Sequence, residues 1–236
     1  MTVSDPRYLL HGLHQGVLST HSIKEPGYPF GSALPFCLDL GGQPLVLVSE
    51  LAQHTRNLHA EPKSSLILYR AVEADQIQAG PRLVLLTEAE FLAPGESEQL
   101  APRYYRYLPS SPDYRLMTDF IFVRLKPVKV HFIAGFGQIR WLAAKDFLTP
   151  SPFSLEQENA LCEDLNTREA GLLSTVWEKI AGKKPGEPVA LAGIDALGGD
   201  LRAGARLLRF SFDGPVDVLQ DAWHLLHQGQ VSPEED

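Results

Sequence analysis

Cysteine is scarce in this sequence, with Cys37 and Cys162 the only two among 236 residues. One falls in an expected strand and the other in an expected helix, far apart along the chain. A metal site built from thiolates needs more sulfur ligands than these two residues supply. We therefore exclude such a site and interpret both thiols as buried packing residues rather than as a disulfide.

Basic residues are in the minority, with 21 Lys and Arg against 29 Asp and Glu and a formal net charge of −8. Binding to a phosphate backbone requires a positive field, so the composition argues against nucleic acid as the main partner. No apolar run approaches the roughly 20 residues that cross a bilayer, and the first residues lack the basic flank and apolar core of a signal peptide. We expect a cytoplasmic protein without a membrane partner.

Common catalytic motifs are also missing. The sequence contains no His-Glu-x-x-His motif, no phosphate loop and no nucleophile elbow. Ser19 and His21 alternate along an expected strand, yet no acidic residue is placed to complete a catalytic triad. The chemistry of this chain must therefore be sought in another arrangement of side chains.

An ordinary soluble core can be built, because 44% of the chain is hydrophobic and its mean hydropathy is −0.10. Residues 16–68 are the most informative stretch: they are expected to form strand, loop, strand, tight turn, strand, short polar helix and strand. The glycines of residues 39–43 supply the positive φ that a hairpin turn needs. Pro35 predicts that the second of these strands lies at a sheet edge, carries a bulge or begins there.

The short polar helix is the first candidate for a binding site. Ser49 is expected to cap it, and Pro62 follows its end. An apolar stripe of Leu51, Thr55 and Leu58 would leave His54 and Asn57 pointing elsewhere. Four residues of this region, with one cation from a later strand, offer donors for a phosphate: Ser49, His54, Thr55, Asn57 and Arg82. The alternative is an amphipathic helix with a solvated outer face, with Arg82 an ordinary surface charge.

Further strands are expected at residues 64–70 and 81–89, and both are apolar on their two faces. This pattern fits a barrel whose outer surface is covered by another subunit. We also expect a tyrosine-rich helix at 95–108, strands at 120–126 and 130–134, and a last strand through Trp141. The strands of this part then number six or seven and are antiparallel. A small barrel accommodates such a set with few exposed edges.

A second domain is expected after a linker with two prolines. Ser154 and Gln157 form a capping box, and Asn166 with Glu169 is a weaker case of the same pattern. Two helices lead to strands at 189–195 and 205–212, paired around Gly198 and Gly199, and a final helix follows. We predict a split-barrel cofactor-binding domain at residues 1–146 and a small α-α-β-β-α accessory domain at 154–230.

The order of elements and the amino-acid sequence of residues 49–58 resemble the flavin-binding split barrel of the pyridoxamine 5′-phosphate oxidase superfamily. Within it, the sequence is most similar to the haem-utilisation (HugZ-like) branch, which shares the Gly135-Phe136-Gly137-Gln138 wording. The resemblance implies an α+β fold: an antiparallel split β-barrel followed by the accessory domain. It also implies a homodimer that binds a planar redox cofactor, FMN or haem, at the subunit interface.

The resemblance further implies an oxidoreductase, with haem breakdown for iron use as its most specific form, and Ser49, His54, Thr55 and Asn57 as residues that line the site. The alternatives are a non-catalytic carrier of haem or flavin and a flavin-dependent oxidase or reductase of a small molecule. Haem requires an axial ligand, usually histidine. The tail that can supply it in haem-degrading relatives has no counterpart here, and residues 164–169 lack the histidines that this branch commonly carries in its accessory domain.

Overall fold

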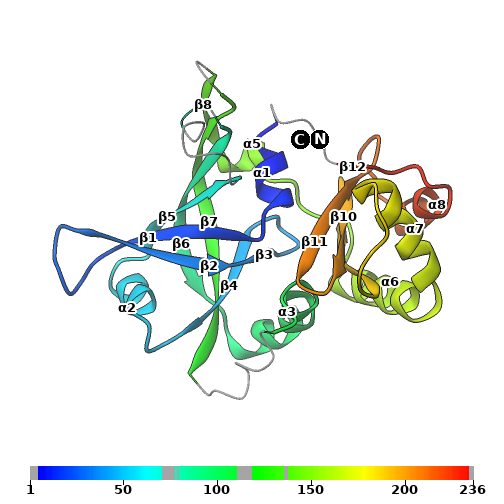
Figure 1. The fold of residues 1–236 in the computed structure, drawn as a ribbon. Helices are drawn as coiled ribbons and strands as arrows, with labels where there is room; N and C mark the ends of the chain where they lie inside the picture. The colour runs from blue at the N-terminus through cyan, green and yellow to red at the C-terminus, as the bar shows by residue number, and fades with distance from the viewer. Residues whose placement is uncertain (1–4, 71–77, 79, 111–118, 136–137, 234–236) are drawn as a thin grey trace.

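The structure is a computed structural model, and it describes residues 5–70, 78, 80–110, 119–135 and 138–233. The first part of the chain forms a large sheet with flanking helices (Figure 1). Its elements are α1 (Arg7–Gly12), β1 (Gln15–His21), β2 (Pro29–Pro35), β3 (Cys37–Leu38), β4 (Pro44–Ser49), α2 (Gln53–Ala60), β5 (Lys63–Tyr69), β6 (Arg82–Phe91), α3 (Pro94–Tyr107), β7 (Phe120–Ile133), β8 (Ile139–Ala143) and α5 (Ala144–Phe147).

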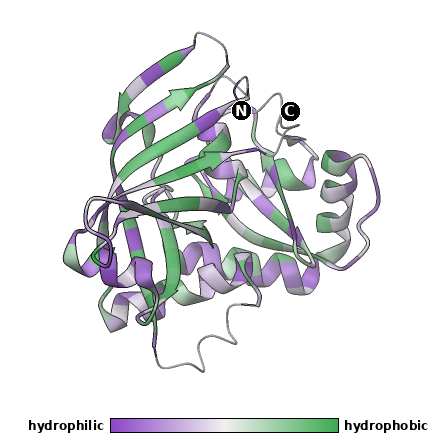
Figure 2. Cartoon of the chain, turned by 60° about the vertical axis from the view of Figure 1, so that its left-hand side comes forward, coloured by the Kyte–Doolittle hydropathy of each residue, from purple (hydrophilic) through white to green (hydrophobic). Residues whose placement is uncertain are grey.

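The large sheet is antiparallel, with the strand order β2-β1-β5-β6-β7-β4-β3 and with β8 added to β7. It curls around a core of alternate strand residues, among them Leu18, Leu66, Leu85 and Phe132, all with no exposed surface. Figure 2 shows the hydrophobic segments that run along these strands. The predicted antiparallel split barrel is confirmed. None of the described helices is long and apolar enough to span a membrane.

Two turn and edge predictions are confirmed. In the β3–β4 hairpin the Asp39 N–H donates to the Gln43 carbonyl at 2.8 Å, and Gly42 has a φ of +75°. A side chain at Gly42 would be strained in this conformation, which explains the glycine. Pro35 ends β2, the outer strand of the sheet, where its missing N–H removes no ladder bond.

The two strands predicted at 120–126 and 130–134 are one continuous strand, β7. Pro127 does not end it, because the β6–β7 register shifts there: Thr87 lies opposite Pro127 and Leu86 opposite Lys129, so that Val128 has no partner. A bulge of this kind accepts a residue that cannot donate to the ladder and turns its neighbour outward.

The second part of the chain forms a smaller antiparallel sheet, ordered β12-β11-β10-β9, with helices packed on it (Figure 1). Its elements are α6 (Leu155–Arg168), α7 (Ala170–Ala181), β9 (Val189–Asp195), β10 (Gly198–Ala203), β11 (Arg206–Ser211), α8 (Leu219–His227) and β12 (Ser232–Pro233). The capping box of Ser154 and Gln157 is confirmed at the start of α6.

Two details of this part differ from the sequence prediction. Gly198 and Gly199 begin a strand, β10, and the turn is formed by Ala196 and Leu197 before them. Position 198 requires glycine because a Cβ there would lie 2.0 Å from the Phe210 carbonyl oxygen. Asn166 is not a helix cap: its side chain accepts from the Leu191 N–H (2.6 Å) and donates to the Leu191 carbonyl (3.1 Å). The amide therefore fastens α6 to β9 as a backbone group would.

The junction between the two parts is polar and buried. Arg103 of α3 forms an ion pair with Glu158 of α6, and both side chains are almost fully enclosed. On the α1 side, His11 Nδ1 lies 3.1 Å from Asp195 Oδ2. The division into domains at residues 1–146 and 154–230 stays a prediction, but its two sides share buried charges.

Candidate functional site

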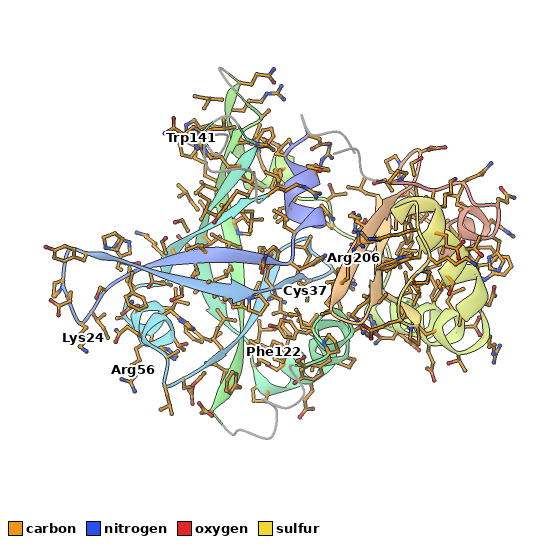
Figure 3. The ribbon with its side chains drawn as sticks, in the orientation of Figure 1. Lys24, Cys37, Arg56, Phe122, Trp141 and Arg206 are labelled. Carbon is orange, nitrogen blue, oxygen red and sulfur yellow. The ribbon has the colours of Figure 1, made fainter. Side chains whose placement is uncertain are left out.

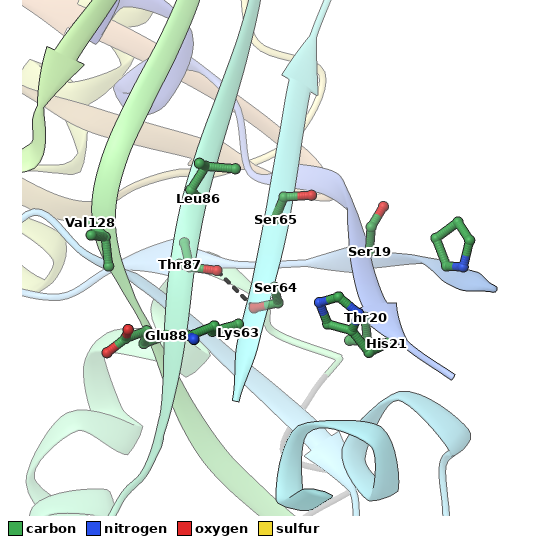
Figure 4. A pocket seen from close by; sticks show the side chains of 11 residues that line it. Ser19, Thr20, His21, Lys63, Ser64, Ser65, Leu86, Thr87, Glu88 and Val128 are labelled. Carbon is green, nitrogen blue, oxygen red and sulfur yellow. Dashed lines mark hydrogen bonds between the residues drawn. The ribbon is translucent and has the colours of Figure 1, made fainter. Parts of the chain in front are cut away.

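A groove of about 430 Å³ lies on the outer face of the large sheet, across β1, β5, β6 and β7 (Figure 4). Because strand side chains alternate between faces, every second residue of these strands points into it. Ser19 and His21 come from β1, Lys63 and Ser65 from β5, and Leu86 from β6. The opposite face of the same strands carries the hydrophobic core.

The floor of the groove is apolar and uncovered. Leu86 is 39% exposed and Val128, the residue displaced outward by the bulge in β7, is 56% exposed. Large apolar side chains that are exposed together in one groove are typical of a surface that meets a ligand or another protein. The bulge thus adds an apolar side chain to the groove floor.

The rim beside this floor is polar. Ser19 and Ser65 lie opposite each other in the β1–β5 register, and Lys63 lies opposite Glu88 in the β5–β6 register. Lys63 and His21 are exposed and can reach a bound molecule. A cation, an imidazole and two hydroxyls beside an apolar floor can hold a flat apolar group that carries an anionic substituent.

A second row of hydroxyls lies beneath the rim. Ser64 Oγ and Thr87 Oγ1 are 2.8 Å apart and buried, as the dashed line in Figure 4 shows. Thr20, buried beside them, receives a hydrogen bond from the Asn57 side chain at 2.8 Å. These groups satisfy one another, so they support the groove wall rather than offering donors to a ligand.

Ser49 does not cap a helix. It ends β4, its hydroxyl donates to Asp119 and accepts from the Leu51 N–H at 3.1 Å, and α2 begins only at Gln53. The prediction was wrong because a turn, closed by the Ala52 N–H on the Ser49 carbonyl at 3.1 Å, separates Ser49 from the helix. The same carbonyl accepts from Thr55 Oγ1 at 2.7 Å. Ser49 and Thr55 are therefore brought together, but as a structural link between β4 and α2.

Asn57 faces inward, contrary to the sequence prediction. It has no exposed surface, and its side-chain oxygen accepts from the Ile23 N–H (3.1 Å) and from Gln53 (2.8 Å). Leu51, assigned to the buried stripe, is 68% exposed and precedes the helix. The Asn57 side-chain amide also donates to Thr20 of β1. Asn57 therefore holds α2 against β1, the strand that forms one side of the groove.

His54 and Arg82 lie apart from each other. His54 is partly buried between α2 and β2, where its Nδ1 is 3.2 Å from Ser32 Oγ and burial lowers the pKa of its imidazole. Its Nε2 has no hydrogen-bond partner among the described residues. Arg82 begins β6 and donates to the Gln78 carbonyl at 2.8 Å. It is separated from Glu88 by six residues of extended strand, roughly 20 Å.

None of the five predicted residues lines the groove, and whether any of them contacts a cofactor stays a prediction. The sequence analysis missed Lys63 and Ser65 and considered Ser19 and His21 only as part of a triad. The available signal was the alternation of polar residues on two strands that pair with each other. Residues 136–137 of the Gly135–Gln138 motif lie outside the described residues. Beside them, where the chain passes from β7 to β8, the Ala134 N–H donates to the Gln138 carbonyl at 3.1 Å.

Replacing Asn57 with alanine should lower the free energy of unfolding by about 2 kcal/mol, because the Ile23 N–H and Thr20 hydroxyl lose a buried partner. Urea denaturation measures this change. Arg56→Ala, an exposed position on the same helix, is the matched control and should stay within about 0.5 kcal/mol of the parent. Equal stabilities for the two variants would contradict the structural role of Asn57.

Comparison with known proteins identifies relatives of this fold. The family model described as pyridoxamine 5′-phosphate oxidase matches residues 7–134, a range that contains β1 to β7 and α2. Among solved structures, protein Atu2129 of unknown function from Agrobacterium tumefaciens superposes with a TM-score of 0.77 at 24% identity, covering 96% of this chain and 92% of that one. This protein and Atu2129 therefore share the two-part fold over nearly the whole length of both chains.

Two curated relatives carry haem-related names. The chloroplastic non-canonical heme oxygenase HOZ of Arabidopsis thaliana is 36% identical over 160 residues, which is 67% of this chain and 46% of that protein. This chain thus spans about half the length of the plant relative. The heme oxygenase HutZ of Vibrio cholerae is 27% identical over 135 residues, 56% of this chain and 76% of its own length.

Proposed function

The chain belongs to the pyridoxamine 5′-phosphate oxidase family, in its haem-utilisation branch, and from this premise we propose that it binds haem in the groove of β1, β5, β6 and β7. The observation that carries the proposal is the juxtaposition of an apolar floor with the Lys63 rim on an uncovered sheet face. Both curated relatives are named heme oxygenases, which favours haem over other planar ligands.

The residues present fit such a ligand. Leu86 and Val128 offer a flat apolar surface, Lys63 and Ser65 offer a cation and a hydroxyl for a carboxylate, and His21 offers an exposed imidazole at the same rim. Haem, when bound, supplies the iron at which oxygen chemistry takes place. The chain's own part is to bind the macrocycle, to orient its acidic edge toward Lys63 and to shield it from water.

FMN is the second candidate, because the same donors suit its phosphate and the same floor suits its ring. Lys63 with the hydroxyls of Ser19 and Ser65 provides charge-assisted and neutral hydrogen bonds for a phosphate dianion. The family to which the chain belongs takes its name from an oxidase of a phosphorylated substrate. The two cofactors are separated by the visible spectrum of the loaded protein.

Titration of haem, and separately of FMN, into the purified protein tests the site. Lys63→Ala should weaken binding about tenfold or more, since a charge-assisted contact contributes roughly 1.5–3 kcal/mol. Lys145→Ala removes an exposed lysine from α5, away from the groove, and should bind as the parent does. If Lys63→Ala and His21→Ala both bind each cofactor like the parent, the groove is not the site.

We also propose an oxidoreductase activity on bound haem, with a non-catalytic carrier as the alternative. A reductant and oxygen added to the haem-loaded protein should abolish its Soret band if the chain supports haem breakdown. A Soret band that persists through repeated turnover conditions would favour the carrier.

A second copy of the chain is proposed to cover the groove. On the same outer face, Trp141 of β8 (Figure 3) is 54% exposed and Ile139 is 60% exposed. The Lys129 ammonium lies 5.1 Å from the centre of the indole ring. Together with Leu86 and Val128, four large apolar side chains are exposed on this face, as is typical of a face that meets another protein.

We therefore expect a homodimer that buries about 1,600 Å² or more. Sedimentation velocity measures the assembly, and Val128→Lys should shift it toward monomer because it places a charge in the interface. Gln220→Lys, at an exposed position of α8 that does not line the groove, is the control for an added positive charge. A parent protein that stays folded and monomeric at micromolar concentration would refute the dimer.

A further inference from the structure

We propose that the second part of the chain binds a small doubly charged oxyanion of the phosphate class in a pocket between the end of α7 and the β10–β11 hairpin. The pocket has a volume of about 310 Å³. It is lined by Trp177 of α7, by Lys183 and Lys184 after that helix, by Glu187 and by Arg206 at the start of β11. Arg206 is labelled in Figure 3. This site is separate from the groove on the large sheet.

The first observation is a set of cations without acidic partners. Within the described ranges, Lys183, Lys184 and Arg206 form no ion pair with a carboxylate, whereas Arg103, Arg124 and Arg209 each do. Like charges that meet in one pocket repel one another, and a bound anion offsets that repulsion. Such a convergence is unexpected in a chain with a net charge of −8.

The second observation is a buried donor without an acceptor. Trp177 is only 2% exposed, yet its indole N–H has no hydrogen-bond partner in the part of the chain that the structure describes. A buried indole N–H normally finds an acceptor. The Arg206 guanidinium carbon lies over the same ring, 5.6 Å from its centre, and both side chains line the pocket.

The charge and size of the pocket indicate the ligand class. Three cations against the single carboxylate of Glu187 leave a surplus of two positive charges, which matches a dianion. Glu187 is held against the β10–β11 turn, where a Cβ at Gly204 would lie 2.2 Å from its Oε1. The volume is too small for a haem-sized molecule but accommodates inorganic phosphate or the phosphate end of a small ester.

Trp177 provides a local readout. The chain contains three tryptophans, so Trp141→Phe with Trp223→Phe leaves Trp177 as the single emitter in the otherwise full-length protein. Titration with inorganic phosphate should give a saturable change in its emission. Sulfate should compete, acetate should compete weakly, and sodium chloride should weaken binding because the contacts are near the surface.

Substitutions of both signs test the electrostatics. Lys183→Gln with Lys184→Gln should weaken phosphate binding about tenfold, and Arg206→Gln by a similar factor. Glu187→Gln should strengthen it about threefold, since it removes the one opposing charge. Lys145→Gln is the control and should leave the affinity unchanged, and thermal melts confirm that each variant is folded.

An emission that does not respond to phosphate, or equal affinities in all of these variants, would overturn the proposal. So would binding of an acidic peptide or an oligonucleotide at this pocket without binding of phosphate, because the ligand would then be a macromolecule. Haem titration of the Lys183→Gln/Lys184→Gln variant should match the parent. The two sites can therefore fail or succeed independently.

Discussion

Replacing Glu158 with alanine should lower the free energy of unfolding by about 3–5 kcal/mol, the usual cost of breaking a buried ion pair. Glu158 has no exposed surface. Its Oε1 accepts from Arg103 and from the Ile194 N–H (3.0 Å), and its Oε2 lies 3.2 Å from Arg106. The substitution would leave Arg103, which is 2% exposed, as a buried charge without its carboxylate.

Urea denaturation, which leaves the ionic strength constant, measures the effect. Glu163→Ala, an exposed position on the same helix, should change stability by no more than about 0.5 kcal/mol. Arg103→Met combined with Glu158→Leu should recover much of the loss, because an apolar pair of similar volume leaves no charge unpaired. A Glu158→Ala protein as stable as the Glu163→Ala protein would show that the pair is not buried in solution.

The position of this pair couples the two parts of the chain. Arg106 also donates to the Ala192 carbonyl at 2.8 Å, and Tyr107 donates to Asp200 at 2.7 Å, so α3 is bonded to both α6 and the smaller sheet. Burial and the neighbouring Asp200 raise the pKa of the Tyr107 phenol well above its usual range. We expect one cooperative unfolding transition for the whole chain rather than separate transitions for two domains.

Local patterns explain what could be predicted from the sequence. The alternation of strand residues places the core, the glycines of residues 39–43 set the β3–β4 turn, and Ser154 with Gln157 starts α6. Each of these signals lies within a few residues of its effect, so a single sequence carries it.

Long-range pairing explains what could not. Ser49 was predicted to cap the helix, and Asn57 was placed away from the apolar stripe by helical spacing. Their partners, Asp119 and Thr20, lie far away in the sequence. The rim of the groove depends on strand register, which brings Lys63 and Ser65 beside Ser19 only after β1 and β5 have paired. No local window contains that information.

A second large effect is expected for the buried carboxylate Asp195. Its two carboxylate oxygens each contact a basic side chain. A terminal nitrogen of Arg209 lies 2.7 Å from Oδ1, and His11 Nδ1 lies 3.1 Å from Oδ2. Burial alone would raise the pKa of Asp195, but Arg209 and His11 together hold it well below its usual value. The pKa of Asp200 is also lowered against its burial, mainly by Arg209 and then by His14.

These shifts fix the sign of the pH dependence. In the unfolded chain the aspartates take up protons at a pH of about 3.9, whereas the native state keeps both carboxylates ionised at that pH. The stabilisation they contribute is therefore present at neutral pH and is lost as the pH falls below about 4 toward the native pKa values. Parent protein should lose stability steeply over this acidic range.

Asp195→Asn should lower the free energy of unfolding by about 3 kcal/mol or more at neutral pH, because Arg209 and His11 lose a charged partner in a buried site. It should also flatten the decline of stability in acid, since one of the carboxylates with a lowered pKa is gone. Asp146→Asn, an exposed aspartate, should keep the parent's acid profile. Urea titrations at several acidic pH values compare the three proteins, and an Asp195→Asn profile parallel to that of the parent would show that Asp195 does not carry the shift. Because His11 belongs to α1 and Arg209 to β11, the loss of this carboxylate should weaken the same junction that Glu158 holds from the side of α3.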